Sequence, residues 1–203
     1  MKRCLSILLA GLVLCAACAM NVSAAPRKTF NPDAIRQCVY LNDTTGITGR
    51  GHCGVLLIDA NNYGRLYHFI QSGLMKFTYS PTQLQRFLAG GRPFPESEFQ
   101  FDNAVTFGIT PEEGRRMYDH AETTEFGEFC REASFFAAGL PIKNDNCLTV
   151  ALSITSAGSC KYSFLYPFGL PNSTFYTMQL SLRWHGVPYT VSHPESERVV
   201  PKV

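Results

Sequence analysis

The chain lacks an excess of either charge, internal repeats and low-complexity segments. It carries 18 Lys and Arg residues and 16 Asp and Glu residues. Lys2 and Arg3 belong to an N-terminal segment that we expect to be removed, so the remaining chain is neutral. A neutral chain gives no support to a nucleic acid or an acidic membrane surface as its partner.

The sequence also lacks a second long apolar run. A bilayer span takes about 20 apolar residues, and no segment beyond residue 24 provides them. The apolar run at residues 4–20 follows two positive charges and precedes the small residues Val22 and Ala24. This order is typical of a secretory signal peptide. We expect residues 1–24 to be the signal peptide and cleavage to follow Ala24. Residues 25–203 then form a single domain in the periplasm or outside the cell. In an alternative, Cys18 anchors a lipoprotein.

A metal-binding cysteine pattern is absent as well. Beyond residue 24 the cysteines are Cys38, Cys53, Cys130, Cys147 and Cys160. Their spacings of 15, 77, 17 and 13 residues match no zinc-ribbon pattern, and we expect neither a metal nor a cofactor. Cysteines tend to pair in an oxidising compartment, and five is an odd number. At least one of these thiols is therefore free or bonded to another molecule.

The strand signals begin with a β-hairpin. Branched apolar residues at 54–58 and a second apolar run at 65–70 are separated by turn residues. Residues 103–107 and 174–183 are also predicted strands, the latter because its residues alternate. Residues 33–41 fit either a short helix or a strand.

The helix signals are caps. Ser80-Pro81 and Thr110-Pro111 are each followed by Gln or Glu two residues after the proline, which predicts capping boxes. A third helix is expected over residues 147–156, capped by Asn144 or Asp145 and ended by Gly158. Helices and strands are segregated along the chain, so the expected fold class is α+β. We expect an antiparallel sheet packed against the helix that begins near Cys147.

Cys147 is the first candidate for chemistry. At a helix N-terminus the unpaired amides and the helix dipole favour a thiolate and lower the thiol pKa. The thiolate is the attacking species in cysteine catalysis, and the same amides can face a developing oxyanion. The structural alternative is a buried cysteine or half of a disulfide, with Cys160 as a partner.

His52 and His68 are the next candidates. His52 precedes the strand in Gly51-His52-Cys53-Gly54 and shares a face with Leu56, while Cys53 points the other way. If the hairpin is centred on Asn61, residue 54 faces residue 68, and His52 and His68 become diagonal neighbours on one face. A slip of one residue would separate them. For each histidine alone, a structural role is the alternative.

A cysteine, a histidine base and an orienting polar group are what a thiol hydrolase needs. Gly51-His52 opening an apolar strand, a second strand with His68, and Asn146-Cys147 at a helix start resemble the circularly permuted papain-like hydrolases. That superfamily includes NlpC-like peptidases and lecithin:retinol acyltransferase-like enzymes. The resemblance covers residues 50–160. It implies that Cys147 is the nucleophile, His52 the base and His68 the ring-orienting residue.

The resemblance also suggests a disulfide pattern. If Cys147 is the unpaired thiol, the other cysteines can form two disulfides. Cys53 on the outer face would reach Cys38, and Cys130 would pair with Cys160. Four cysteines allow three connectivities, so this pairing is a hypothesis.

Three functions follow from the sequence. The leading hypothesis is an exported cysteine hydrolase that cleaves an amide bond in peptidoglycan peptides through a thioacyl intermediate. The second is a lipid acyltransferase or esterase on the same fold, with the aromatic stretch 162–168 as its lipid groove. The third is a non-enzymatic, disulfide-stapled secreted binding protein in which Cys147 is structural.

Overall fold

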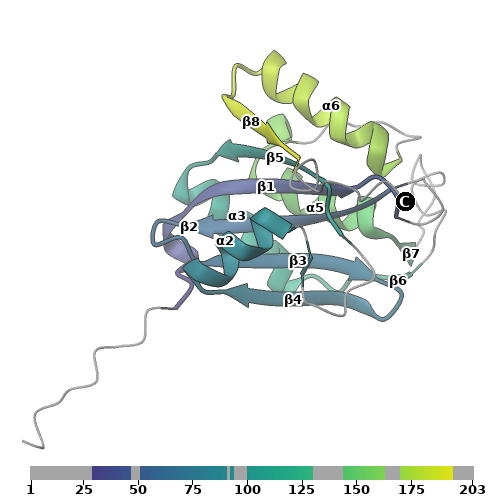
Figure 1. The fold of residues 1–203 in the computed structure, drawn as a ribbon, viewed down its shortest axis with the longest axis horizontal. Helices are drawn as coiled ribbons and strands as arrows, with labels where there is room; N and C mark the ends of the chain where they lie inside the picture. The colour runs from purple at the N-terminus through teal and green to yellow at the C-terminus, as the bar shows by residue number, and fades with distance from the viewer. Residues whose placement is uncertain are drawn as a thin grey trace, which may run out of the picture.

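One antiparallel sheet of six strands organises the described part of the chain (Figure 1). The computed structural model describes residues 29–46, 51–90, 92–93, 100–129, 144–162 and 170–193. The strand order is β4-β3-β2-β1-β5-β8. The bounds are β1 (Ile35–Asp43), β2 (His52–Asp59), β3 (Gly64–Ile70), β4 (Gly73–Tyr79), β5 (Asn103–Gly108) and β8 (Tyr189–Ser192). Residues 1–28, with the predicted signal peptide and Cys18, lie outside the described residues.

The predicted hairpin is confirmed as β2 and β3, and the predicted strand at 103–107 is β5. The ambiguous segment 33–41 is mostly strand: a 3-10 turn, η1 (Pro32–Ala34), leads into β1. β1 lies between β2 and β5 at the centre of the sheet, where pairing on both edges decides its conformation. β4 and β8, at the two edges of the sheet, were not predicted.

Helices cover both faces of the sheet. Leu84 and Phe87 of α2 (Pro81–Gly90) pack on one face with Phe101. On the other face lie α3 (Pro111–Thr123), α5 (Cys147–Gly158) and α6 (Pro171–Trp184). Figure 1 shows α2 in front of the sheet and α3 and α5 behind it. Because it is covered on both faces, β2 is buried along its whole length. Two short elements complete the set: η2 (Cys160–Tyr162) and the parallel pair β6 (Glu128–Phe129) and β7 (Asn144–Asp145).

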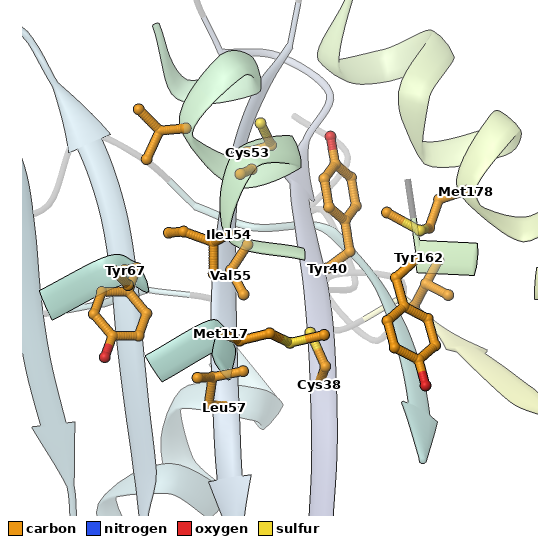
Figure 2. Packing of buried hydrophobic residues seen from close by; sticks show 14 of the residues in the cluster. Cys38, Tyr40, Cys53, Val55, Leu57, Tyr67, Met117, Ile154, Tyr162 and Met178 are labelled. Carbon is orange, nitrogen blue, oxygen red and sulfur yellow. The ribbon is translucent and has the colours of Figure 1, made fainter. Parts of the chain in front are cut away.

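The larger core cluster lies between the sheet and α3, α5 and α6 (Figure 2). Met117 from α3 and Ile154 from α5 pack against Val55 and Leu57 of β2. All four side chains are fully buried. Full burial of a side chain of this size stabilises the fold by about 1.5–3 kcal/mol. The observed class is therefore α+β with a six-stranded antiparallel sheet.

The predicted strand at 174–183 is wrong, because these residues lie in helix α6. Phe175, Met178 and Leu182 are buried at helical spacing. Tyr176 and Leu180, which an alternating pattern could not distinguish from them, are 67 % and 58 % exposed. Pro171 at the first helical position favours this start. The aromatic and β-branched residues of this segment favour a strand locally. The segment is a helix because its buried residues pack against the sheet at helical spacing.

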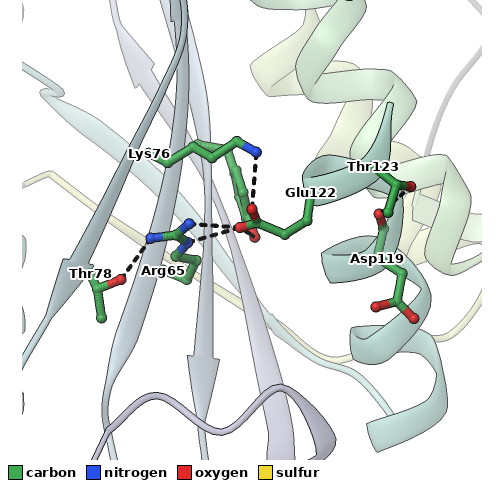
Figure 3. Close-up of polar contacts among 7 residues, drawn as sticks. Arg65, Lys76, Thr78, Asp119, Glu122 and Thr123 are labelled. Carbon is green, nitrogen blue, oxygen red and sulfur yellow. Dashed lines mark hydrogen bonds and ion pairs between the residues drawn. The ribbon is translucent and has the colours of Figure 1, made fainter. Parts of the chain in front are cut away.

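Glu122 connects α3 to strands β3 and β4 through hydrogen bonds and ion pairs (Figure 3). Its Oε1 accepts hydrogen bonds from Arg65 Nε at 3.0 Å, Arg65 Nη2 at 2.8 Å and the Tyr67 hydroxyl at 2.9 Å. Lys76 Nζ lies 3.0 Å from its Oε2. Burial would raise the pKa of Glu122, but the bonds from Arg65, Lys76 and Tyr67 outweigh it and lower the pKa.

None of the described helices is both long and apolar enough to span a bilayer.

Gly114 sets how closely α3 approaches β1. A Cβ at this position would lie 2.6 Å from Ile35 Cβ and 2.8 Å from Ile35 Cγ2. Neither atom can move without shifting the strand, so no side chain fits there at the present spacing. The capping box of Thr110 and Glu113 fixes the helix start one turn earlier, which leaves α3 little freedom to adjust.

We predict that Gly114→Ala lowers the free energy of unfolding by up to about 2 kcal/mol. The overpacking costs about 1–3 kcal/mol and the gain in helix propensity offsets about 1 kcal/mol of it. Gly90→Ala, where an added Cβ meets nothing within 4 Å, is the matched control and should be neutral or slightly stabilising. Urea denaturation measures both. Equal midpoints for the two variants would contradict the close approach of α3.

Candidate active site

Cys147 is the first residue of α5, and Asn146 caps the helix. Asn146 Oδ1 accepts hydrogen bonds from the amides of Leu148 and Thr149, each at 2.9 Å, and Thr149 Oγ1 accepts one from the Asn146 amide at 2.9 Å. The predicted caps, Asn144 and Asp145, instead form β7, so the cap lies one or two residues later than predicted, and the helix begins at Cys147 as expected. This capping box fixes the backbone on which the Cys147 sulfur is carried.

The cap also restricts the oxyanion site expected at this helix start. The amides of Leu148 and Thr149 are bonded to Asn146 Oδ1, and the Val150 amide is bonded to the Asn146 carbonyl. Of the amides in the first turn, the one on Cys147 itself is left to face a developing oxyanion. The dipole of the 12-residue helix still favours negative charge on the Cys147 sulfur.

His52 and His68 meet at the other face of the sheet. The register pairs Val55 with Tyr67, so Gly54 stands opposite His68 and His52 is its diagonal neighbour, as the hairpin centred on Asn61 predicts. The two Nε2 atoms are in hydrogen-bond contact, and the ring centroids lie 4.5 Å apart at 68°. Both side chains are at most 1 % exposed. The structure therefore brings the two predicted histidines together.

Phe101 forms one wall of the histidine pair, which the sequence did not indicate. Its ring lies 6.1 Å from His52 and 5.5 Å from His68, centroid to centroid. Gly54 makes this possible, because a Cβ there would lie 3.3 Å from Phe101 Cζ and 3.0 Å from the Tyr67 carbonyl. Phe101 thus excludes water from the rings, and burial lowers the pKa of His68, with a further contribution from the charge of His52. His68 is held in its neutral form.

The glycine before His52 has a local reason. Gly51 has φ of 91°, and a Cβ at this position would lie 2.2 Å from Asn172 Oδ1 in α6. A residue with a side chain would be strained there and would push α6 away. Asn172 Oδ1 accepts a bond from Asn42 Nδ2 at 3.0 Å, which ties α6 to β1 beside the start of β2. The Gly51-His52 dipeptide therefore lets three elements converge at His52.

Cys53 points away from His52, as predicted, but the face on which it lies is not an outer one. It is 0 % exposed and belongs to the core cluster that contains Cys147 (Figure 2). The predicted Cys38–Cys53 disulfide is wrong, because both thiols are free. Cys38 pairs with Leu57 and Cys53 with Asn42. The two cysteines are thus four residues apart along the strands, about 13 Å. Cys130 lies outside the described residues, and Cys160 is free and exposed.

The Cys53 thiol contacts Cys147, and this interaction shapes the charges of the site. A hydrogen bond from Cys53, together with the His52 ring, holds the pKa of the Cys147 thiol well below its usual range, although burial opposes this. Burial and the adjacent Cys147 raise the pKa of Cys53. Burial and the two cysteines likewise raise the pKa of the neighbouring Tyr40 hydroxyl. Both effects favour negative charge on Cys147 over negative charge on Cys53 or Tyr40.

Cys53 and Tyr40 are the members of the site that sequence reasoning missed. The signal for Cys53 was its position next to His52 on a strand covered on both faces. Tyr40 gave no signal, because its segment fitted a helix as well as a strand. Tyr162, expected in a lipid groove, is buried and donates a hydrogen bond to Glu113 at 2.6 Å. Residues 163–168 of that stretch lie outside the described residues.

Comparison of the chain with protein-family models, with curated proteins and with solved structures finds no match. Within the described ranges, no group of three His, Cys, Asp or Glu side chains is arranged to hold a metal ion.

We predict that iodoacetamide modifies Cys147 in the folded protein at a lower pH than it modifies an ordinary thiol, whose pKa is about 8.5. The lowered pKa keeps the thiolate present until the pH falls through that lower value. His52→Ala should move the profile toward higher pH, and exposed Cys160 serves as the internal reference. Peptide mass spectrometry of timed, quenched samples gives the rates. A Cys147 rate that rises only above pH 8 would contradict the assigned charge.

Proposed function

We propose that this protein is a cysteine hydrolase in which Cys147 is the nucleophile, His52 the base and His68 the residue that orients His52. One observation carries the proposal: a capped helix start holds the Cys147 sulfur where it interacts with His52, whose Nε2 contacts His68. Nucleophile, base and orienting group thus form a continuous chain of contacts, which is the arrangement that thiol catalysis requires.

In the first half of the reaction, the Cys147 thiolate attacks the carbonyl carbon of the substrate. The Cys147 amide faces the oxyanion that forms. Protonated His52 gives its proton to the leaving amine, the C–N bond breaks, and a thioacyl group remains on Cys147. In the second half, His52 takes a proton from water, and the resulting hydroxide attacks the thioacyl carbon. The acid product leaves, and the thiolate is restored.

His68 keeps the His52 ring in place through both halves. Because burial keeps His68 neutral, its Nε2 can accept a hydrogen bond from His52 Nε2 without competing for the catalytic proton. The Nδ1 atom of His52 is then the nitrogen that exchanges protons with the thiol and the substrate. A neutral partner stabilises the imidazolium less than a carboxylate does, but it fixes the ring and its tautomer.

The substrate class follows from the resemblance and the predicted export. Papain-like enzymes of the permuted type suggest an amide bond, and a periplasmic or secreted setting makes peptidoglycan peptides the proposed substrate. The lipid-directed alternative gains no support from Tyr162, which lies in the core. The binding-module alternative required a structural Cys147, typically in a disulfide, whereas Cys147 is a free thiol next to His52.

We predict that Cys147→Ala abolishes release of amines from peptidoglycan fragments, a loss of about 10⁴-fold or more. His52→Ala should cost about 10²–10⁴-fold, the usual contribution of general acid–base catalysis. His68→Ala should lower kcat with little change in KM, because it acts through His52. His185→Ala, an exposed histidine, is the control. Chromatography of the digested fragments measures the products.

Two outcomes would overturn the proposal. One is full activity in Cys147→Ala. The other is a loss of activity only when a different cysteine is replaced.

A further inference from the structure

Cys53 is a buried thiol that favours the Cys147 thiolate but forms no bond to the substrate in the proposed hydrolysis. It lies on β2 next to His52, and its side chain projects to the face that α5 covers. Val55 and Leu57, at alternate positions on the same strand, fill that face with apolar groups. Among the described residues, Cys53 is the cysteine that lies next to the nucleophile. A hydrophobic residue of similar size would fill the same space without reactive chemistry.

The other described cysteines are out of reach of Cys147. Cys38 lies on the same face of the sheet as Cys53 but about 13 Å further along the strands. Cys160 follows the far end of α5, whose 12 residues span about 18 Å. Cys53, by contrast, lies on the face of β2 that α5 covers, in the same buried cluster as Cys147, whose thiolate it favours. Cys53 is therefore the thiol placed to react with an oxidised Cys147.

We propose that Cys53 and Cys147 form a reversible disulfide in response to hydroperoxides, and that this bond switches off the nucleophile. The thiol pair stands on its own, whereas the effect on catalysis rests on the proposed function. The site is thus a peroxide-sensitive modification site as well as a candidate active site.

The chemistry balances in two steps. The Cys147 thiolate attacks one oxygen of the hydroperoxide, the S–O bond forms as the O–O bond breaks, and the second oxygen leaves as an alcohol, or as water when the oxidant is hydrogen peroxide. Cys147 is then a sulfenic acid. The Cys53 sulfur attacks the sulfenic sulfur, the S–S bond forms, and hydroxide leaves with the Cys53 proton as water. Two thiols and one hydroperoxide give one disulfide, one alcohol and one water.

The surroundings of Cys53 order these steps. The charge on Cys147 helps to keep Cys53 protonated, and that charge disappears when Cys147 becomes a neutral sulfenic acid. The neighbouring Tyr40 hydroxyl, which favours the Cys53 thiolate, is unchanged by this step. Tyr40 stands opposite Val55, diagonal to Cys53 on the same face, within reach of a long aromatic side chain. Cys53 thus becomes more acidic at the moment it is needed, and Tyr40 acts as a positioning residue.

The test starts from the reduced full-length protein, freed of reductant and treated with hydrogen peroxide. Unreacted thiols are then alkylated under denaturing conditions and the digest is mapped by mass spectrometry. We expect one cross-linked peptide joining Cys53 to Cys147, with the loss of two hydrogens, and its reversal by dithiothreitol. Amine release from peptidoglycan fragments should disappear and return in parallel.

Cys53→Ser and Cys53→Ala are the test variants, and two are used so that a folding defect in one does not decide the result. Without the resolving thiol, Cys147 should react with dimedone as a sulfenic acid and then oxidise irreversibly. Cys38→Ser, a buried cysteine on the same face, is the control and should form the disulfide as the unaltered chain does. Tyr40→Phe should slow the disulfide step without slowing loss of the Cys147 thiol.

Three outcomes would overturn the inference: dimedone labelling of Cys147 while Cys53 is intact, a Cys147 disulfide to another cysteine such as Cys130, or no reaction with peroxide. The two proposals can fail separately. A Cys53–Cys147 disulfide in a chain without hydrolytic activity would contradict the proposed hydrolase function and support the proposed disulfide. Hydrolytic activity that survives peroxide treatment while Cys53 stays reduced would support the hydrolase function and contradict the proposed disulfide.

Discussion

The packing of the capped end of α5 against β2 is the constraint on which the rest of the site depends. Asn146 uses one side-chain oxygen to bind two amides of the first turn, and so fixes the direction in which Cys147 projects. β2 supplies Cys53 on the face that meets the helix and His52 at its first position. If the cap were lost, the thiol would lose its position relative to both.

Burial of so many polar groups near one strand end is costly unless each finds a partner. The site meets this cost by coupling its members: His68 to His52, His52 to Cys147, and Cys147 to Cys53. A low dielectric strengthens each of these contacts and makes the charge on Cys147 depend on its neighbours. Stability and reactivity therefore come from the same contacts, and replacing any one of these side chains should alter the others.

Much of this arrangement could be predicted from the sequence, since its signals are local. The hairpin itself was predicted, whereas the register that joins His52 to His68 was one of two that the sequence left open. The cap at Thr110 marked the start of α3. What depends on distant packing could not be predicted. Alternation put Cys53 opposite His52 but could not reveal that α5 covers that face. Likewise, residues 174–183 have strand-like composition, and only their burial against the rest of the core makes them a helix.

The central claim is that Cys147 carries a covalent acyl group during turnover. The direct measurement is intact-mass spectrometry of the reduced protein, mixed with peptidoglycan fragments and quenched in acid within the first turnovers. The account predicts a mass increase equal to the acyl part of the fragment, located on Cys147 by peptide mapping and absent from Cys147→Ser under the same conditions. Product formation with an adduct on another residue, or turnover that persists in Cys147→Ser, would contradict it.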